Sequence, residues 1–147
     1  MSIKSDAGPK FIGTASLFID NLYSYNYCTL QIYNGSLYWP LSLDDSQVDN
    51  TSSWLSDPPS QIAPQTWVTF EASSSWGSGC NASVTYRATT ELGQQYVSMG
   101  VEDPVAIEDN SVTMNYSGPC NCTSRIVDKS GNQATGVFYV ALGESPP

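Results

Sequence analysis

The sequence predicts an all-β protein, folded as a single antiparallel β-sandwich of about eight strands over residues 11–142. Three observations support this fold class. Apolar and polar residues alternate over short segments, which is the period of strands with one buried face. Gly, Pro, Asn and Asp residues separate these segments at short intervals, as turns between strands require. No segment keeps apolar residues at helical spacing over three turns.

Each predicted strand depends on its own pattern. Leu30 and Ile32 alternate with polar neighbours, as do Val68 and Phe70 further along the chain. Residues pointing the same way on a strand are two apart, so each of these pairs marks a face that can be buried. In chain order, the predicted strands span residues 11–19, 27–33, 37–43, 66–72, 82–89, 94–101, 111–116 and 136–142.

The connections follow from turn residues and polarity. Asn34-Gly35 is typical of a tight hairpin turn, so residues 37–43 are predicted to pair with the strand that precedes them. Pro40 has no N–H to donate to a neighbouring strand, which places this segment at a sheet edge. Residues 44–53 are predicted to form a polar loop, and residues 102–110 an acidic one.

Composition limits the classes of function. Residues 1–10 are expected to be a flexible N-terminal segment without the apolar core of a signal peptide, and residues 143–147 a frayed tail. No run of about 18 apolar residues could cross a membrane. The net charge is −9, from 14 acidic and 5 basic residues. Nucleic acid is therefore excluded as a partner, because its binding needs clustered basic residues, and anionic membranes are disfavoured.

Cysteine and sequon patterns favour a secreted or extracellular protein; a cytoplasmic protein with buried thiols, released without a signal peptide, is the alternative. The chain has four Cys and no His, which excludes a Cys/His zinc site. Because a Cys120–Cys122 bridge would close a tiny strained ring, Cys28 and Cys80 are expected to pair with Cys120 and Cys122, in either order. N-glycosylation sequons exceed the roughly two that chance would give, and they begin at Asn34, Asn50, Asn81, Asn115 and Asn121.

The residue types argue against an enzyme. Without histidine, Ser–His and Cys–His nucleophiles are excluded. Glu102-Asp103 and Glu108-Asp109 are neighbours in sequence, so each pair would point to opposite faces of a strand and would not converge for glycoside hydrolysis. Asp44, Asp45 and Asp49 offer oxygen ligands for calcium, but their spacing matches no defined calcium loop. No catalytic residue, metal or other cofactor is expected.

Aromatic residues supply the positive evidence for a function. The chain has 4 Trp and 9 Tyr, whose apolar rings and polar tips suit a membrane interface or a sugar face. Trp39 and Trp54 are expected to pack in the core. Trp76, in a Ser/Gly-rich loop, is expected to be exposed, and Trp67 is compatible with either position. The candidate ligand-binding residues are Trp76, Trp54, Trp67 and Tyr38.

The middle of the chain carries a distinctive order of residues. Two prolines and an Ile follow a Trp, and a strand ending in Ala-Ser leads through a glycine turn into a strand with Tyr. In this order the chain resembles the aegerolysins, with the likeness extending more sparsely over residues 28–142. The resemblance implies a small acidic β-sandwich that binds specific membrane lipids, in some members together with a larger pore-forming protein. The matching residues are Trp54, Pro58-Pro59, Ile62, Pro64, Phe70, Ala72-Ser73, Gly77, Gly79, Val84 and Tyr86.

The sequence therefore predicts a non-enzymatic binding protein for a neutral or zwitterionic membrane lipid. Trp76 and Trp54 are its first candidate anchors, in a peripheral contact with the membrane. Membership of a cytolytic system with a pore-forming partner follows from the resemblance alone. A secreted lectin, whose aromatic rings stack on carbohydrate, is one alternative. A secreted effector or surface protein that binds another protein is the other.

Overall fold

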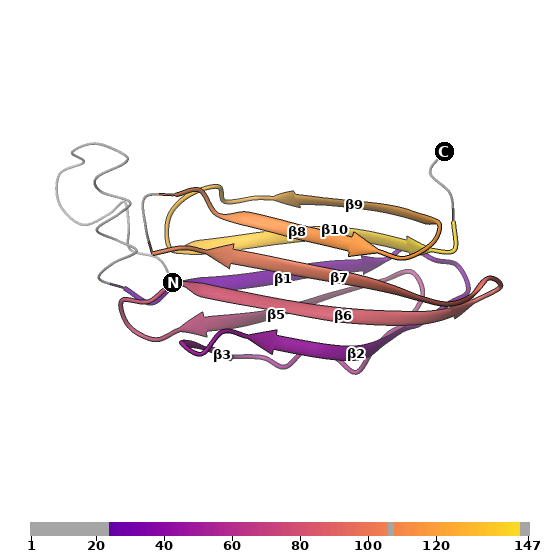
Figure 1. Ribbon diagram of the computed structural model, residues 1–147, viewed down its shortest axis with the longest axis horizontal. Helices are drawn as coiled ribbons and strands as arrows, with labels where there is room; N and C mark the ends of the chain where they lie inside the picture. Colours follow the sequence, from indigo (N-terminus) through magenta and orange to yellow (C-terminus); the bar gives the residue numbers. More distant parts are fainter. Residues whose placement is uncertain (1–23, 106–107, 145–147) are drawn as a thin grey trace.

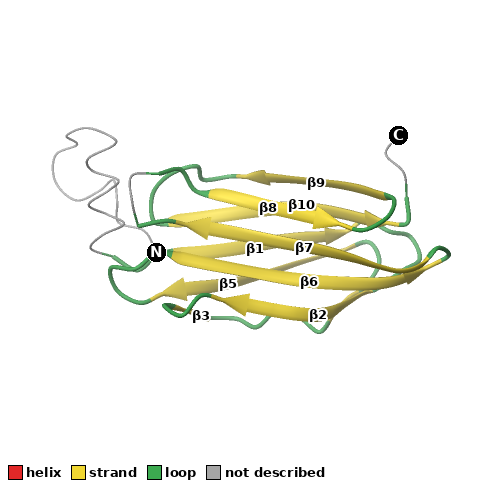
Figure 2. Ribbon diagram, in the orientation of Figure 1, coloured by secondary structure: helices red, strands yellow, loops and turns green. Residues whose placement is uncertain are grey.

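The computed structural model describes residues 24–105 and 108–144, which form two five-stranded sheets packed face to face (Figure 1, Figure 2). The first sheet has the strand order β3-β5-β1-β10-β9, and the second has the order β4-β2-β6-β7-β8. The described residues contain no helix, and hence none that could span a membrane. The strands are β1 (Tyr27–Asn34), β2 (Leu41–Val48), β3 (Ser52–Trp54), β4 (Gln61–Ile62), β5 (Thr66–Ser74), β6 (Cys80–Thr90), β7 (Gly93–Asp103), β8 (Ser111–Tyr116), β9 (Cys120–Ile126) and β10 (Gln133–Leu142).

Alternation within the strands builds the core between the sheets. Leu30 and Ile32 of β1 are fully buried, whereas Gln31 between them is only half-buried. Tyr86, Phe70 and Phe138 are the three largest sealed side chains. Burying side chains of this kind stabilises the fold by about 2–3 kcal/mol each. The hydroxyl of Tyr86 donates a hydrogen bond of 2.7 Å to the carbonyl of Pro59, and burial raises the pKa of this phenol.

The predicted strands are mostly confirmed, but their number is wrong. The segments predicted at 27–33, 66–72, 82–89, 94–101, 111–116 and 136–142 correspond to β1, β5, β6, β7, β8 and β10. The described residues form ten strands. Three of them, β3, β4 and β9, were not predicted because their sequences lack a clear alternation of apolar and polar residues. Two of these three are very short, and β9 is mostly polar. The strand predicted at 11–19 and the segment 1–10 lie outside the described residues, as does most of the predicted tail.

Asn34-Gly35 does not form the predicted hairpin turn. β1 pairs with β5 on one side and, in parallel, with β10 on the other. The chain after Asn34 instead crosses to the second sheet through residues 35–40, which we call the crossing loop. The side-chain nitrogen of Asn34 donates hydrogen bonds to the carbonyls of Trp39 (2.8 Å) and Ile62 (3.1 Å). These contacts with residues outside the dipeptide override the local turn preference.

Two further predictions about connections and pairing are corrected. β2 begins only at Leu41, after Pro40, and continues to Val48, so half of the predicted polar loop at 44–53 belongs to this strand, and its last two residues belong to β3. Its polarity misleads because one face of β2 lies on the outside of the second sheet, in contact with water. The sandwich is also not wholly antiparallel, since β1 and β10 run in the same direction.

The predicted disulfide pairing is not the one in the structure. Cys120 is bonded to Cys122, with their Cα atoms 5.4 Å apart, whereas Cys28 and Cys80 are free and buried. Cys28 lies opposite Ala134 of β10 and Cys120 lies opposite Leu142, eight positions along the same strand. At about 3.3 Å per residue this separates them by about 25 Å. A disulfide spans less than about 7 Å between Cα atoms, so the cross-pairing of Cys28 with Cys120 is excluded.

Four of the five sequon asparagines are accessible. Asn50, Asn81 and Asn115 are exposed and Asn121 is half-buried, and glycosylation of these four stays a prediction. Asn34 is completely buried, and its amide nitrogen already binds two carbonyl groups. A glycan on Asn34 is incompatible with this fold, so that expectation is wrong.

Candidate functional site

The structure separates the four candidate aromatic residues. Tyr38 and Trp67 lie at the end of the sandwich where β1 ends and β5 begins, on the right in Figure 1, and are 71% and 55% exposed. Trp76 is 59% exposed in the β5–β6 turn at the opposite end. Trp54 is half-buried and packs edge-on against Phe70, with ring centroids 5.6 Å apart. Trp54 therefore packs against the core, as the sequence predicts. It is not placed to act as a membrane anchor.

Three aromatic rings form a ladder on the outer face of the first sheet. The strand register places Trp67 directly opposite Tyr33, and Tyr33 directly opposite Tyr139. The ring centroids are 4.9 Å apart in the first pair and 5.6 Å apart in the second. Aromatic pairs of this kind contribute about 0.5–1.5 kcal/mol each beyond simple burial. The ladder thus supports Trp67 on one side and leaves more than half of its surface free.

The crossing loop extends this aromatic surface. Leu37 is 63% exposed, and Tyr38 stands edge-on against the half-buried ring of Trp39 at a centroid distance of 5.8 Å. The ring of Tyr139 covers Gly35, where a β-carbon would lie 2.5 Å from ring atoms. Glycine is therefore needed for the loop to lie against the ladder. We call the resulting cluster the aromatic rim, and it consists of Tyr33, Leu37, Tyr38, Trp67 and Tyr139.

Gln65 connects the crossing loop to the ladder. Its side-chain nitrogen donates a hydrogen bond of 2.8 Å to the carbonyl of Gly35, and its side-chain oxygen accepts one of 3.2 Å from the hydroxyl of Tyr33. Its backbone N–H donates to the carbonyl of Asn34 at 2.7 Å. Gln65 has a φ of 59°, and it is the one non-glycine residue with positive φ in the described part of the chain. The surrounding contacts hold this strained conformation in place next to the rim.

We expect Gln65→Ala to be less stable than Gln65→Gly by about 1 kcal/mol. Both variants lose the side-chain hydrogen bonds, but only glycine adopts a positive φ without steric penalty. Urea unfolding of the two variants, followed by tryptophan fluorescence, measures the difference. Equal stabilities would show that the backbone at Gln65 carries no strain.

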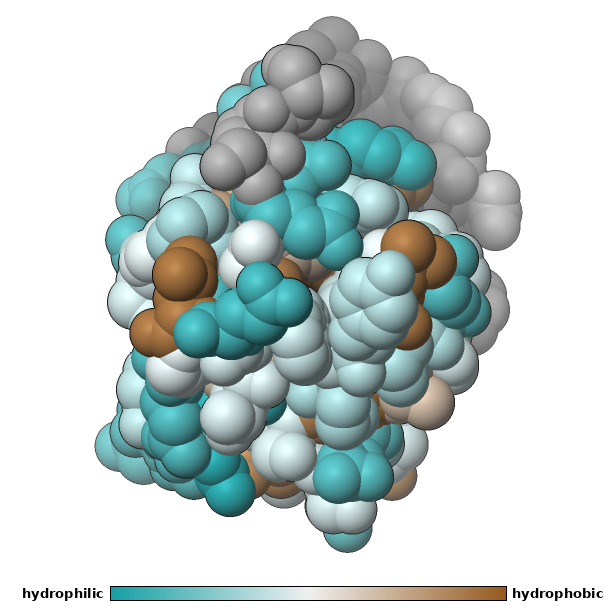
Figure 3. All heavy atoms as spheres, turned by 90° about the vertical axis from the view of Figure 1, so that its right-hand side faces the viewer, coloured by the Kyte–Doolittle hydropathy of each residue, from teal (hydrophilic) through white to brown (hydrophobic). Residues whose placement is uncertain are grey.

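Charge is distributed unevenly between the two ends of the sandwich. The loops at the rim end are residues 35–40, 63–65, 91–92 and 117–119, and the segment 143–144 follows β10 at the same end. Together they contain two charged residues, Glu91 and Glu144. Figure 3 looks onto this end, where apolar residues emerge at separate points among residues of near-neutral hydropathy. At the opposite end, the loops and adjoining strand ends that the structure describes carry one basic residue, Lys129, beside Asp49, Glu102, Asp103, Glu108, Asp109 and Asp128.

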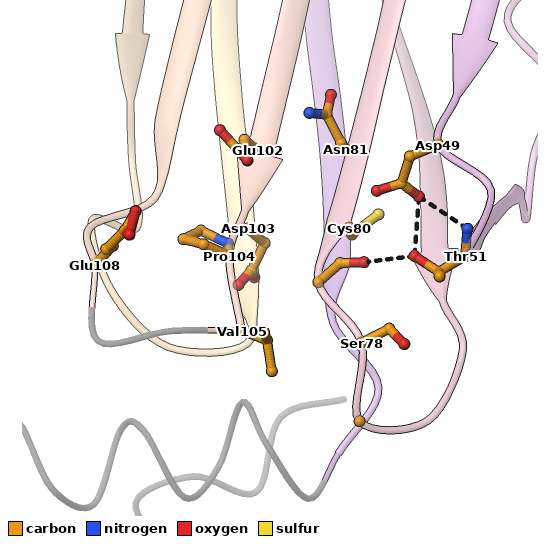
Figure 4. Close-up of a pocket in the computed structure, with 12 residues that line it drawn as sticks. Asp49, Thr51, Ser78, Cys80, Asn81, Glu102, Asp103, Pro104, Val105 and Glu108 are labelled. Carbon is orange, nitrogen blue, oxygen red and sulfur yellow. Dashed lines mark hydrogen bonds between the residues drawn. The ribbon is translucent and has the colours of Figure 1, made fainter.

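An open hollow of about 470 Å³ lies at this acidic end (Figure 4). Asp49, Glu102 and Glu108 line it with exposed side chains, and the buried Asp103 lies beside them. Asp49 accepts a hydrogen bond of 3.2 Å from the backbone N–H of Thr51. Among the described residues, no three His, Cys, Asp or Glu side chains are placed to hold a metal ion. The hollow places negative charge at the end of the molecule farthest from the rim.

Trp76 forms a smaller aromatic pair beside the hollow. Its ring lies edge-on to that of Tyr25, with centroids 5.3 Å apart, and both side chains are exposed. Gly77, the next residue, lines the hollow itself. Trp76 is exposed, as expected, but its acidic surroundings make it a weaker candidate than Trp67 for contact with a membrane.

Sequence reasoning missed several members of the site. Tyr33 and Tyr139 each occupy an outward-facing position in a strand with alternating burial. This alternation is visible in the sequence and could have identified both as surface aromatic residues. Their meeting with Trp67 depends on strand pairing, which local patterns do not report. Leu37 was assigned to a strand, and nothing in the sequence marks Gln65 as a connecting residue.

No family model and no curated protein matches the chain. Among solved structures, the chain is similar to the crystal structure of the lipid binding protein Nakanori, with a TM-score of 0.62 and 12% sequence identity. The match covers 88% of this chain and 77% of that one. At this identity the likeness concerns the fold alone.

Proposed function

We propose that this protein is a non-enzymatic binding protein that docks on membranes through the aromatic rim and recognises a neutral or zwitterionic lipid headgroup. The observation that carries the proposal is the exposure of Leu37, Tyr38 and Trp67 at an end with little charge, where Trp67 packs on the half-buried ring of Tyr33. Tyrosine and tryptophan favour the bilayer interface, where the ring is in apolar surroundings and the polar tip remains hydrated. The fold likeness to a lipid binding protein and the aegerolysin resemblance at 54–86 support the same function.

The rim is built to bind without losing much conformational freedom. The ring of Trp67 packs on Tyr33, and Tyr38 stands on Trp39. Side chains that are already ordered lose less entropy when they bind. Burying the exposed parts of Leu37, Tyr38 and Trp67 would contribute several kcal/mol at about 25 cal/mol per Å². That contribution favours a reversible, peripheral contact with the membrane.

The proposal extends in two directions. One direction is the setting of the protein, for which the accessible sequons at Asn50, Asn81 and Asn115 favour a secreted or extracellular location. The other is a larger pore-forming partner, which the aegerolysin resemblance supports and which the docked sandwich would recruit to the membrane surface. The acidic end would then face away from the bilayer and be available to that partner.

Vesicle sedimentation tests the proposal directly. The full chain is incubated with vesicles of phosphatidylcholine, of sphingomyelin with cholesterol, and of phosphatidylethanolamine with phosphatidylcholine, and in parallel with an array of glycans. We expect binding to at least one of these vesicle types and none to the glycans. Glycan binding without vesicle binding would instead make the rim a lectin site. Capture of a protein partner with both assays blank would support the protein-binding alternative.

Anionic lipid is expected to weaken this binding. The chain has a net charge of −9, so phosphatidylserine added to the vesicles should repel it, and added salt should restore binding by screening. Binding to purely zwitterionic vesicles should change little between about 0.05 M and 0.5 M salt, because the rim is nearly uncharged. Sedimentation across both series measures the effect. Tighter binding to anionic vesicles would contradict the proposed orientation.

A further inference from the structure

Cys28 and Cys80 form a pair of thiols in the interior of the sandwich. Cys28 belongs to β1 of the first sheet, and Cys80 begins β6 of the second. They are 0% and 1% exposed. The side-chain nitrogen of Asn26, two residues before Cys28, donates a hydrogen bond of 2.6 Å to the carbonyl of Ser78, two residues before Cys80. This contact holds the starts of β1 and β6 together, and the two thiols interact across the space between the sheets. Two sulfur atoms from facing sheets therefore meet at a position where packing alone would accept any small apolar side chain.

The surroundings of the two thiols are unequal. The hydrogen bond to Cys80, together with burial, raises the pKa of the Cys28 thiol, and the same hydrogen bond lowers the pKa of Cys80. The sulfur of Cys28 also lies 3.3 Å from the carbonyl oxygen of Val101, an acceptor that likewise favours the protonated thiol. Cys80 is thus the better thiolate of the pair, and a thiolate is the nucleophile in disulfide exchange.

Both cysteines are buried, but Cys80 is nearer the surface of the molecule. Cys80 is one of the residues that line the hollow at the acidic end, where Figure 4 shows it between Asp49 and Asp103. Cys28 lies behind it and has no exposed surface. Because both thiols are sealed in the folded protein, an oxidant would react with the pair before the sheets close during folding.

We propose that Cys28 and Cys80 are an oxidation site and form a disulfide that links the two sheets. This pairing differs from the cross-pairing that the sequence suggested and from the free thiols of the present structure. It joins residues 52 positions apart, at the end of the sandwich opposite the aromatic rim. Cross-linking a long loop restricts the unfolded chain and so stabilises the folded one.

The reaction balances with a disulfide compound, such as oxidised glutathione, as the oxidant. The Cys80 thiolate attacks one sulfur of that disulfide, which forms a mixed disulfide and releases the first thiol. Cys28, on losing its proton, attacks the sulfur of Cys80 and releases the second thiol. The protein pair loses two electrons and two protons, and the oxidant gains both as two thiol groups.

The tryptic map of the wild-type chain tests the proposal without any substitution. Cleavage at Lys10, Arg87 and Arg125 places Cys28 and Cys80 together in peptide 11–87, and Cys120 and Cys122 together in peptide 88–125. The protein is folded in a glutathione redox buffer, denatured, alkylated without reduction and digested. We expect peptide 11–87 to be unlabelled and lighter than its reduced form by two hydrogen atoms. Alkylated cysteines in this peptide, or its covalent attachment to peptide 88–125, would overturn the proposal.

A matched variant isolates the pair. In Cys120→Ala/Cys122→Ala only Cys28 and Cys80 remain, so intact mass after alkylation reports this pair alone. We expect no label before reduction and two labels after it, together with a higher urea midpoint for the oxidised form than for the reduced form. Two labels before reduction would overturn the proposal. Vesicle binding should be the same in both redox states, so this result is independent of the function assigned to the rim.

Discussion

Replacing Trp67 and Tyr38 together by alanine is expected to weaken binding to zwitterionic vesicles by about a hundredfold, which corresponds to about 3 kcal/mol. Truncating a buried aromatic anchor commonly costs 2 kcal/mol or more, and the rim presents these two rings from separate elements. The loss should appear as weaker sedimentation with every vesicle composition that the parent protein binds. It should not depend on salt, because neither side chain is charged.

The opposite end of the molecule provides a matched control. Trp76→Ala/Tyr25→Ala removes one exposed tryptophan and one exposed tyrosine from the acidic end. We expect this variant to bind vesicles like the parent protein. Circular dichroism and urea unfolding should show that both double variants remain folded. If the Trp76 and Tyr25 variant loses binding and the Trp67 and Tyr38 variant retains it, the membrane-facing end has been assigned wrongly.

Asn34→Ala is expected to lower the free energy of unfolding by about 3 kcal/mol. The substitution removes the hydrogen bonds that the Asn34 side chain donates to the carbonyls of Trp39 and Ile62, and it leaves the backbone N–H of Ser36 without its 3.2 Å acceptor. An unsatisfied buried polar group costs about 1 kcal/mol or more. With a slope of about 1–3 kcal/mol per M, the urea midpoint should fall by 1 M or more. The crossing loop that carries Tyr38 would also lose its main attachment.

Asn115→Ala is the matched control for Asn34→Ala. Both residues begin sequons, but Asn115 is exposed on the edge strand β8, whereas Asn34 is sealed inside. We expect a change of no more than about 0.5 kcal/mol for Asn115→Ala, as is usual for surface positions. Equal effects in the two variants would mean that the hydrogen bonds of Asn34 do not stabilise the crossing between the sheets.

Local patterns predicted most of the long strands because each strand carries its own evidence. The alternation of Leu30 and Ile32 with outward-facing neighbours is visible in a few residues, and the structure confirms it as β1. The same signal misleads where the two faces of a strand do not differ clearly in polarity. In β2 most residues are polar, so the sequence predicts a loop over most of it. The signal is absent where a strand has only two or three residues, as in β3 and β4.

The candidate site was predicted only in part. Exposure of Trp76 and burial of Trp54 follow from their neighbours in sequence, and Trp67 stayed undecided because its surroundings come from other strands. Tyr33 and Tyr139 lie more than a hundred residues apart, and only the parallel pairing of β1 with β10 brings them together. The pairing of the cysteines could not be predicted for the same reason. It depends on which strand ends lie together in the folded protein.

By itself, the sequence determined that the chain is all-β, that one face of most long strands is buried, and that the charge is strongly negative. The net charge is a sum over residues, and the alternation is a pattern among near neighbours in sequence. Both can therefore be read without knowing the fold. Only the tertiary structure decided the strand order, the crossing at Asn34, the assembly of the rim and the meeting of Cys28 with Cys80. Each of these depends on register and contact between distant segments, which are set by packing of the whole core.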